Sequence, residues 1–103
     1  MPTDKDIEFV RFLLDSTKTG KMQWEPTAEQ NVFTTSLQGK YHAFVMNQGN
    51  YPSLRLLDDS DQLLLDVFSG EAEQVSELYE FVRRKALNVD SVLDNLMRGE
   101  RKR

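Results

Sequence analysis

The chain contains no cysteine, and this absence removes several kinds of chemistry at the outset. Without thiols it can form neither a disulfide framework nor a zinc–thiolate site, and it has no thiol nucleophile or redox pair. We therefore expect no thiol-based redox function and no cofactor. Since disulfides belong to oxidising compartments, their absence favours the cytoplasm.

Long apolar runs are also missing. The longest are only a few residues, whereas a membrane-spanning helix needs about 20 consecutive apolar residues. The segment Met1–Asp6 is polar and acidic, unlike the basic start and apolar stretch of a secretory signal. We therefore expect a soluble protein that is neither exported nor bound to a membrane.

Positive charge is scarce over most of the chain. The net charge is -4, and outside Arg98–Arg103 there are nine Lys and Arg against sixteen Asp and Glu. Such a surface would repel a phosphate backbone, so nucleic acid is an unfavourable partner. Arg98–Arg103 is the exception, with four bases and one acid, and it could form a basic patch with Arg83–Lys85. For Arg83–Lys85 we favour stabilisation of a helix C-terminus, which attracts cations, over a nucleic-acid surface. For Arg98–Arg103 we favour a short charged tail that is solubilising or disordered.

A length of 103 residues, with 39% hydrophobic and 10% aromatic residues, suits one packed domain. We expect a single α+β domain over residues 1–98 and a basic tail over residues 99–103. An amphipathic helix should begin at Thr3, which with Asp6 forms a capping-box pattern, and should end by Gly20. Its apolar arc is wide and needs cover from the sheet and from another helix or a partner chain. The arc contains Ile7, Phe9, Val10, Phe12, Leu13 and Leu14.

The middle of the chain predicts an antiparallel meander of four or five strands, because strand-like segments alternate with short turns rich in Gly, Asn and Asp. The predicted strands are 21–25, 32–37, 40–47, 52–58 and 62–68. The alternation of side chains assigns one face to the core. That face would carry Phe33, Thr35, Leu37, Phe44, Met46, Leu54 and Leu56, and the opposite face Val32, Tyr41, Val45 and Leu57.

Two helices should follow the sheet and pack on one of its faces. The first should run from Ser69–Gly70 to Asn88, with Val75, Leu78, Tyr79, Val82 and Ala86 as its apolar stripe. The second should be capped by Asp90 and carry Val92, Leu93, Leu96 and Met97.

Residues that could carry chemistry are few. His42, the single histidine, has no catalytic partner in a recognisable motif, so the pattern favours a structural or surface role. The run Asp58–Asp61 is rich in oxygen ligands but lacks the spacing of a calcium loop, and a plain hairpin turn is favoured over a metal site. Trp24 should seal the edge of the core. We predict no catalytic residue and no metal ligand.

Four segments together resemble a type of small uncharacterised bacterial protein found in mobile DNA, including phage and integron gene cassettes. The resemblance covers most of the chain. Because the matching residues are packing and turn residues, it implies a fold and no activity. The segments are Gly20-Lys21-x-x-Trp24, Phe33-Thr34-Thr35-Ser36-Leu37-x-Gly39, Tyr51-x-x-Leu54-x-Leu56-x-Asp58 and Leu78-Tyr79-x-x-Val82-Arg83-Arg84.

Two kinds of function remain open. The preferred hypothesis is a non-enzymatic protein-interaction module that forms a homodimer or binds another protein, because the first helix and the second sheet face have surplus apolar surface. Its interface candidates are Phe9, Phe12, Tyr41, Val45 and Leu57. The alternative is a small-molecule binder or minor enzyme with a pocket between the sheet and the helices. Its lining candidates are Trp24, Tyr41, His42 and Tyr79.

Overall fold

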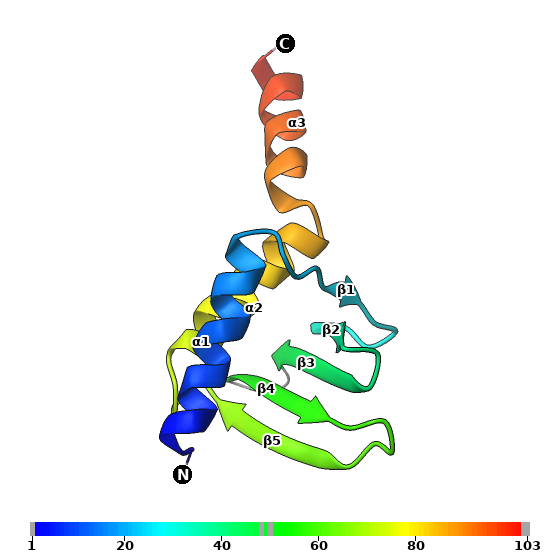
Figure 1. The fold of residues 1–103 in the computed structure, drawn as a ribbon. Helices are drawn as coiled ribbons and strands as arrows, with labels where there is room; N and C mark the ends of the chain where they lie inside the picture. Colours follow the sequence, from blue (N-terminus) through cyan, green and yellow to red (C-terminus); the bar gives the residue numbers. More distant parts are fainter. Residues whose placement is uncertain (1, 48, 50, 102–103) are drawn as a thin grey trace.

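The helices and strands follow the predicted order. The structure is a computed structural model that describes residues 2–47, 49 and 51–101 (Figure 1). An N-terminal helix precedes a five-stranded antiparallel meander, and two helices follow it, which confirms the α+β fold. The elements are α1 (Asp4–Lys18), β1 (Glu25–Pro26), β2 (Val32–Leu37), β3 (Tyr41–Asn47), β4 (Pro52–Leu57), β5 (Leu63–Phe68), α2 (Gln74–Ala86) and α3 (Val89–Arg101).

The sheet has its strands in chain order, β1-β2-β3-β4-β5, and each neighbouring pair is antiparallel. The register is continuous through the centre of the sheet. Phe33 lies opposite Val45, Val45 opposite Leu54, and Leu54 opposite Val67. These four side chains form a row across one face, because residues directly opposite each other in paired strands share a face.

Helices α1 and α2 lie on the same side of the sheet (Figure 1). Helix α2 packs against β3 and β4, and α1 packs against α2. The predicted capping box is present, since Thr3 Oγ1 accepts from the amide of Asp6 and the Asp6 side chain accepts from the amide of Thr3. Burial of the apolar face of each helix against the other helix and the sheet then completes the core. Its most deeply buried members are Val10, Leu13, Val45, Leu54, Val67, Val75, Leu78 and Val82.

The prediction for the faces of β3 was wrong. Val45 is fully buried on the helix-covered face with Ala43, whereas Phe44 and Met46 belong to the opposite face. The β3 sequence is apolar at both parities, so alternation alone could not choose between them. Phe33 lies opposite Val45 in the register, and this pairing fixes the face that Val45 occupies.

Several predicted boundaries also shift. The first strand is Glu25–Pro26 instead of 21–25, and α2 begins at Gln74 because residues 69–73 form a turn. Helix α3 continues to Arg101, so the residues predicted as a separate tail are partly helical, while Lys102 and Arg103 lie outside the described part of the chain. Gln48 and Asn50 of the predicted turn between β3 and β4 lie outside it as well.

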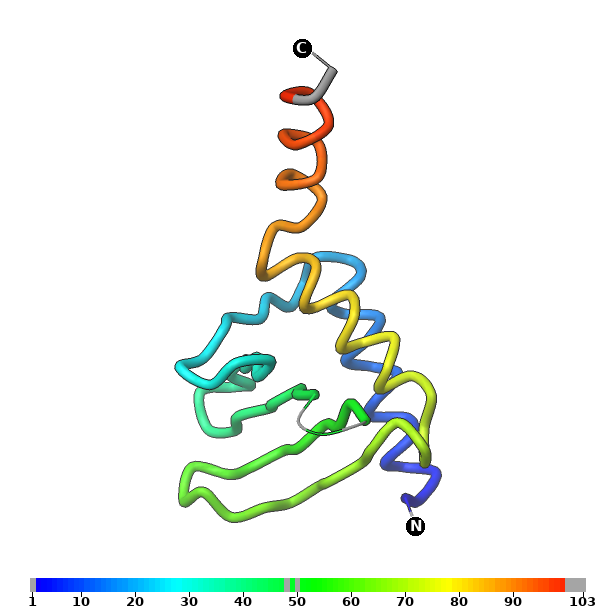
Figure 2. Tube along the Cα trace, turned by 180° about the vertical axis from the view of Figure 1, so that it is seen from behind, coloured from blue at the N-terminus to red at the C-terminus, as the bar shows by residue number. Residues whose placement is uncertain are grey.

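Helix α3 differs most from expectation. It extends from the end of α2 away from the sheet, with its C-terminal end as the far tip of the molecule (Figures 1 and 2). The described chain is correspondingly elongated, measuring 53 × 28 × 27 Å. The helices that cover the sheet are therefore α1 and α2, and residues 90–99 of α3 are all exposed.

Candidate functional site

An unpartnered apolar surface of the described chain lies along α3. Four large side chains on this helix are exposed, and Leu96 keeps 61% of its accessible surface. Their spacing of three and four residues places them on one face of the helix, where they form a continuous stripe. We define the α3 stripe as Val89, Val92, Leu93, Leu96 and Met97, of which Val89 is half-buried.

The connection to α2 sets the direction of α3. Asn88 has a left-handed backbone with φ of 56°, and its amide donates to the carbonyl of Lys85 at 3.2 Å. This conformation ends α2, because it turns the chain out of the helical path. The guanidinium of Arg84 in α2 forms an ion pair with the carboxylate of Asp90, so the first turn of α3 is tethered to the last turn of α2.

Charge is unevenly distributed along α3. Asp90 and Asp94 lie in its first half, whereas Arg98 and Arg101 lie in its second half, where Glu100 is the only acid. In the sequence Lys102 and Arg103 follow. The helix therefore carries an acidic end near the body and a basic end at the tip.

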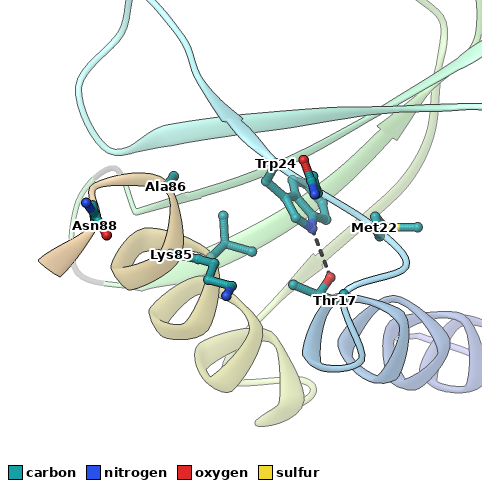
Figure 3. Close-up of a pocket in the computed structure, with 9 residues that line it drawn as sticks. Thr17, Met22, Trp24, Lys85, Ala86 and Asn88 are labelled. Carbon is teal, nitrogen blue, oxygen red and sulfur yellow. Dashed lines mark hydrogen bonds between the residues drawn. The ribbon is translucent and has the colours of Figure 1, made fainter. Parts of the chain in front are cut away.

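A pocket of about 380 Å³ lies where the end of α1, the loop before β1 and the end of α2 meet (Figure 3). The indole ring of Trp24 forms part of its wall, and the Trp24 Nε1–H donates to Thr17 Oγ1 at 2.9 Å. Because this hydrogen bond occupies the indole N–H, Trp24 offers only its ring to a ligand. Charge at the pocket comes from the ammonium group of Lys85. The other lining residues are Gly20, Met22, Gln23, Val82, Ala86 and Asn88.

The four predicted pocket residues do not come together. Trp24 lines the pocket just described, whereas His42 lines a separate depression of about 350 Å³ with Thr34, Ser36 and other residues at the β1 end of the sheet. Tyr79 is buried in the core, with its ring centroid 6.1 Å from that of Phe33. Tyr41 starts β3 opposite Leu37. The buried position of Trp24 confirms its predicted packing role.

The predicted interface residues also separate. Val45 is fully buried, so it cannot belong to an exposed interface, and the prediction for it was wrong. Phe9 is half-buried against the core, whereas Phe12 is 55% exposed. The two rings are stacked, with 6.2 Å between their centroids. Tyr41 and Leu57 are half-buried. Of the five candidates, Phe12 is the one with a largely free side chain.

A second exposed apolar surface lies along β5, which is an edge strand of the sheet. Three apolar side chains of this strand are each between 43% and 52% exposed, namely Leu63, Leu64 and Phe68. The ring of Tyr51 packs edge-on against that of Phe68, with 6.3 Å between the ring centroids. Edge strands present unpaired backbone groups and can pair with another chain. We refer to Leu63, Leu64 and Phe68 as the β5 edge surface.

The Asp-rich segment forms the expected turn. The carboxylate of Asp58 accepts from the amides of Ser60 and Gln62, each at 2.9 Å, and Asp61 adopts a left-handed backbone. These bonds account for the position of Asp58 within the turn. Within the described ranges, no three His, Asp or Glu side chains gather closely enough to hold a metal ion.

The helices and the similarity of the chain to known proteins give no further indication of a site. None of the helices in the described part of the chain has the length and apolar character required to cross a membrane. No protein-family model, curated protein or solved structure matches the chain. The resemblance to small bacterial proteins of mobile DNA therefore remains a prediction.

Sequence reasoning found the apolar residues of α3 but assigned them to the core. Their spacing specifies a helix with one apolar face, and it carries no information about whether the covering surface belongs to the same chain. The connection from α2 to α3 gives no further signal, because a link as short as Leu87–Asn88 also suits a helix that folds back onto the body.

Proposed function

We propose that this protein is a non-enzymatic protein-interaction module that associates with itself through the α3 stripe. The observation that carries the proposal is the projection of an amphipathic helix, with four large apolar side chains exposed, beyond the body that the rest of the chain forms. Monomeric proteins rarely leave such a contiguous apolar surface uncovered unless it is used for binding.

The length of α3 supports the same conclusion. It has 13 residues, and isolated helices shorter than about 12 to 15 residues are only marginally stable in water. Such helices gain most of their stability from packing of their apolar face. Because residues 90–99 are exposed in the single chain, that packing has to come from another molecule. Gly99 within the helix lowers its intrinsic stability further.

The test is the solution mass measured by size-exclusion chromatography with light scattering over a wide range of protein concentrations. We expect the mass to rise above 12.0 kDa as concentration increases. Leu96→Glu places a charge in the centre of the stripe and should restore the monomer mass. Ser91→Glu changes an exposed residue on the side of α3 opposite the stripe, and this matched control should associate like the parent.

Circular dichroism and thermal unfolding of both variants show whether the body stays folded. A parent that remains at 12.0 kDa at every concentration would refute self-association. Equal association of the Leu96→Glu variant and the parent would show that another surface is responsible, with the β5 edge surface as the next to test.

A second candidate function rests on the Trp24 pocket. An aromatic wall, an apolar floor from Val82 and Ala86, and one ammonium group at Lys85 suit a small ligand with an apolar part and an anionic group. Thermal shift with a panel of aromatic and aliphatic carboxylates tests this function, because a ligand that binds the native state raises the melting temperature. A positive result should be lost in Lys85→Met, and the absence of any shift across the panel would count against it.

A further inference from the structure

We infer that the partner of α3 is the α3 helix of a second copy, packed against it in antiparallel orientation. This inference rests on the proposed function and adds the identity and direction of the pairing. It follows from the symmetry of the α3 stripe, from the charges along the helix, and from the position of α3 at one end of the molecule.

The stripe is self-complementary when it is reversed. A two-fold axis level with the point between Asp94 and Asn95 places Leu93 level with Leu96 of the second copy, and Val92 level with Met97 of the second copy. All four exposed side chains of each helix then meet apolar side chains of the other. An interface in which the same patch serves both molecules is the isologous contact that closes a two-fold dimer.

Charge decides the direction of the pairing. In the antiparallel arrangement the start of each helix, with Asp90, lies level with the end of the other, near Arg98, whereas Asp94 lies close to the two-fold axis. In a parallel arrangement acids would lie beside acids and bases beside bases, which is repulsive. The helix dipoles add to the preference, because the positive end of one helix then neighbours the negative end of the other.

The shape of the molecule permits the antiparallel pair. Since α3 projects from one end of an elongated chain, two copies can overlap along α3 while their bodies stay at opposite ends of the helix pair (Figures 1 and 2). A parallel pair would bring the two bodies side by side. Their surface would then carry like charge, because the chain outside Arg98–Arg103 is strongly acidic.

The size of the contact predicts a reversible dimer. A helix of 13 residues is about 20 Å long and about 10 Å wide, so each contributes a face of about 200 Å² and the pair buries roughly 400 Å² in total. Stable interfaces usually bury about 1,200 to 2,000 Å². We therefore expect weak association, with the fraction of dimer rising as the protein concentration increases.

The absence of cysteine makes the geometry directly measurable, because a single introduced cysteine can be labelled without competition. Asn95→Cys places a dye at the centre of α3, outside the stripe. Lys5→Cys places a dye on an exposed side chain at the start of α1, near the end of the molecule opposite α3 (Figure 1). For each variant, donor-labelled and acceptor-labelled chains are mixed, and energy transfer is measured on samples whose mass is known from light scattering.

An antiparallel α3 pair predicts high transfer at position 95 and little transfer at position 5, because the two Lys5 sites lie at opposite ends of a dimer longer than the 53 Å monomer. High transfer at both positions would overturn the inference in favour of a parallel pair. A dimer mass with little transfer at position 95 would overturn it in favour of another surface, such as the β5 edge surface. A monomer mass at every concentration would refute the proposed self-association itself.

Leu96→Glu added to the Asn95→Cys variant should abolish transfer at position 95.

Discussion

The indole Nε1–H of Trp24 donates to Thr17 Oγ1 at 2.9 Å (Figure 3), and the same hydroxyl donates to the carbonyl oxygen of Leu13 at 2.7 Å. This relay ties the loop after α1 to the last turns of the helix. Both side chains are buried, so neither bond can be replaced easily by water.

Thr17→Val should therefore destabilise the protein by about 1 to 3 kcal/mol, because it leaves the buried indole N–H without an acceptor at nearly constant volume. Urea unfolding measures the change. Thr19→Val, which removes an exposed hydroxyl that donates to the carbonyl of Asp15, is the control and should cost less than about 0.5 kcal/mol. Equal losses in the two variants would show that the relay has no special role.

The two stacked phenylalanines of α1 should differ in their contribution to stability. Phe9 packs against the core, so Phe9→Ala should cost about 2 kcal/mol, roughly half of the loss for a fully buried ring. Phe12 is mainly exposed, and Phe12→Ala should cost less than about 1 kcal/mol. Urea unfolding compares the two. A larger loss for Phe12 would mean that its ring is covered in solution, most simply by a second molecule.

The backbone at Asn88 should be sensitive to side-chain shape. Its φ of 56° lies in the left-handed region, where a β-branched residue is strained, so Asn88→Val should destabilise the protein by about 1 to 2 kcal/mol. Asn88→Gly tolerates this backbone and should stay within about 0.5 kcal/mol of the parent. Urea unfolding with circular dichroism measures both. If the Val variant is as stable as the Gly variant, the turn between α2 and α3 does not hold this conformation.

Tyr79 should make stability fall at alkaline pH. Burial raises the pKa of its phenol, Arg83 lowers it and Glu80 raises it, with burial the largest effect. The unfolded chain therefore loses this proton first, so the stability that the neutral phenol contributes is complete below pH 10 and is lost as the pH rises through the folded pKa. The unfolding free energy between pH 9 and 11.5 should decline more steeply for the parent than for Tyr79→Phe. The difference in slope corresponds to the release of at most about one additional proton on unfolding. Parallel slopes would contradict this assignment.

The sequence predicted the elements and their order because local patterns specify them. The capping pattern at Thr3, the turn residues between strands and the apolar spacing of α2 each depend on a few neighbouring residues. The face of β3 depends instead on its register with β2. Apolar residues occur on both sides of β3, so only the pairing of Phe33 with Val45 decided which side faces the helices.

The candidate site was less accessible to prediction for a related reason. An apolar stripe indicates that one face of a helix is buried against another surface, as for Val92, Leu93, Leu96 and Met97. A helix that packs in the core of its own chain and a helix that binds another molecule show the same pattern. The pocket at Trp24 depends on three segments that converge from separate parts of the chain, which no spacing along the sequence reveals.

The order of the strands has a consequence for how the chain folds. Because every strand pairs with its neighbour in sequence, the sheet forms by closing short loops, whereas the docking of α2 onto β3 and β4 and of α1 onto α2 must wait for distant residues to meet. We therefore expect the body to fold rapidly and as one molecule. Pairing of α3 would follow as a second-order step, whose rate rises with protein concentration while the rate of body folding does not.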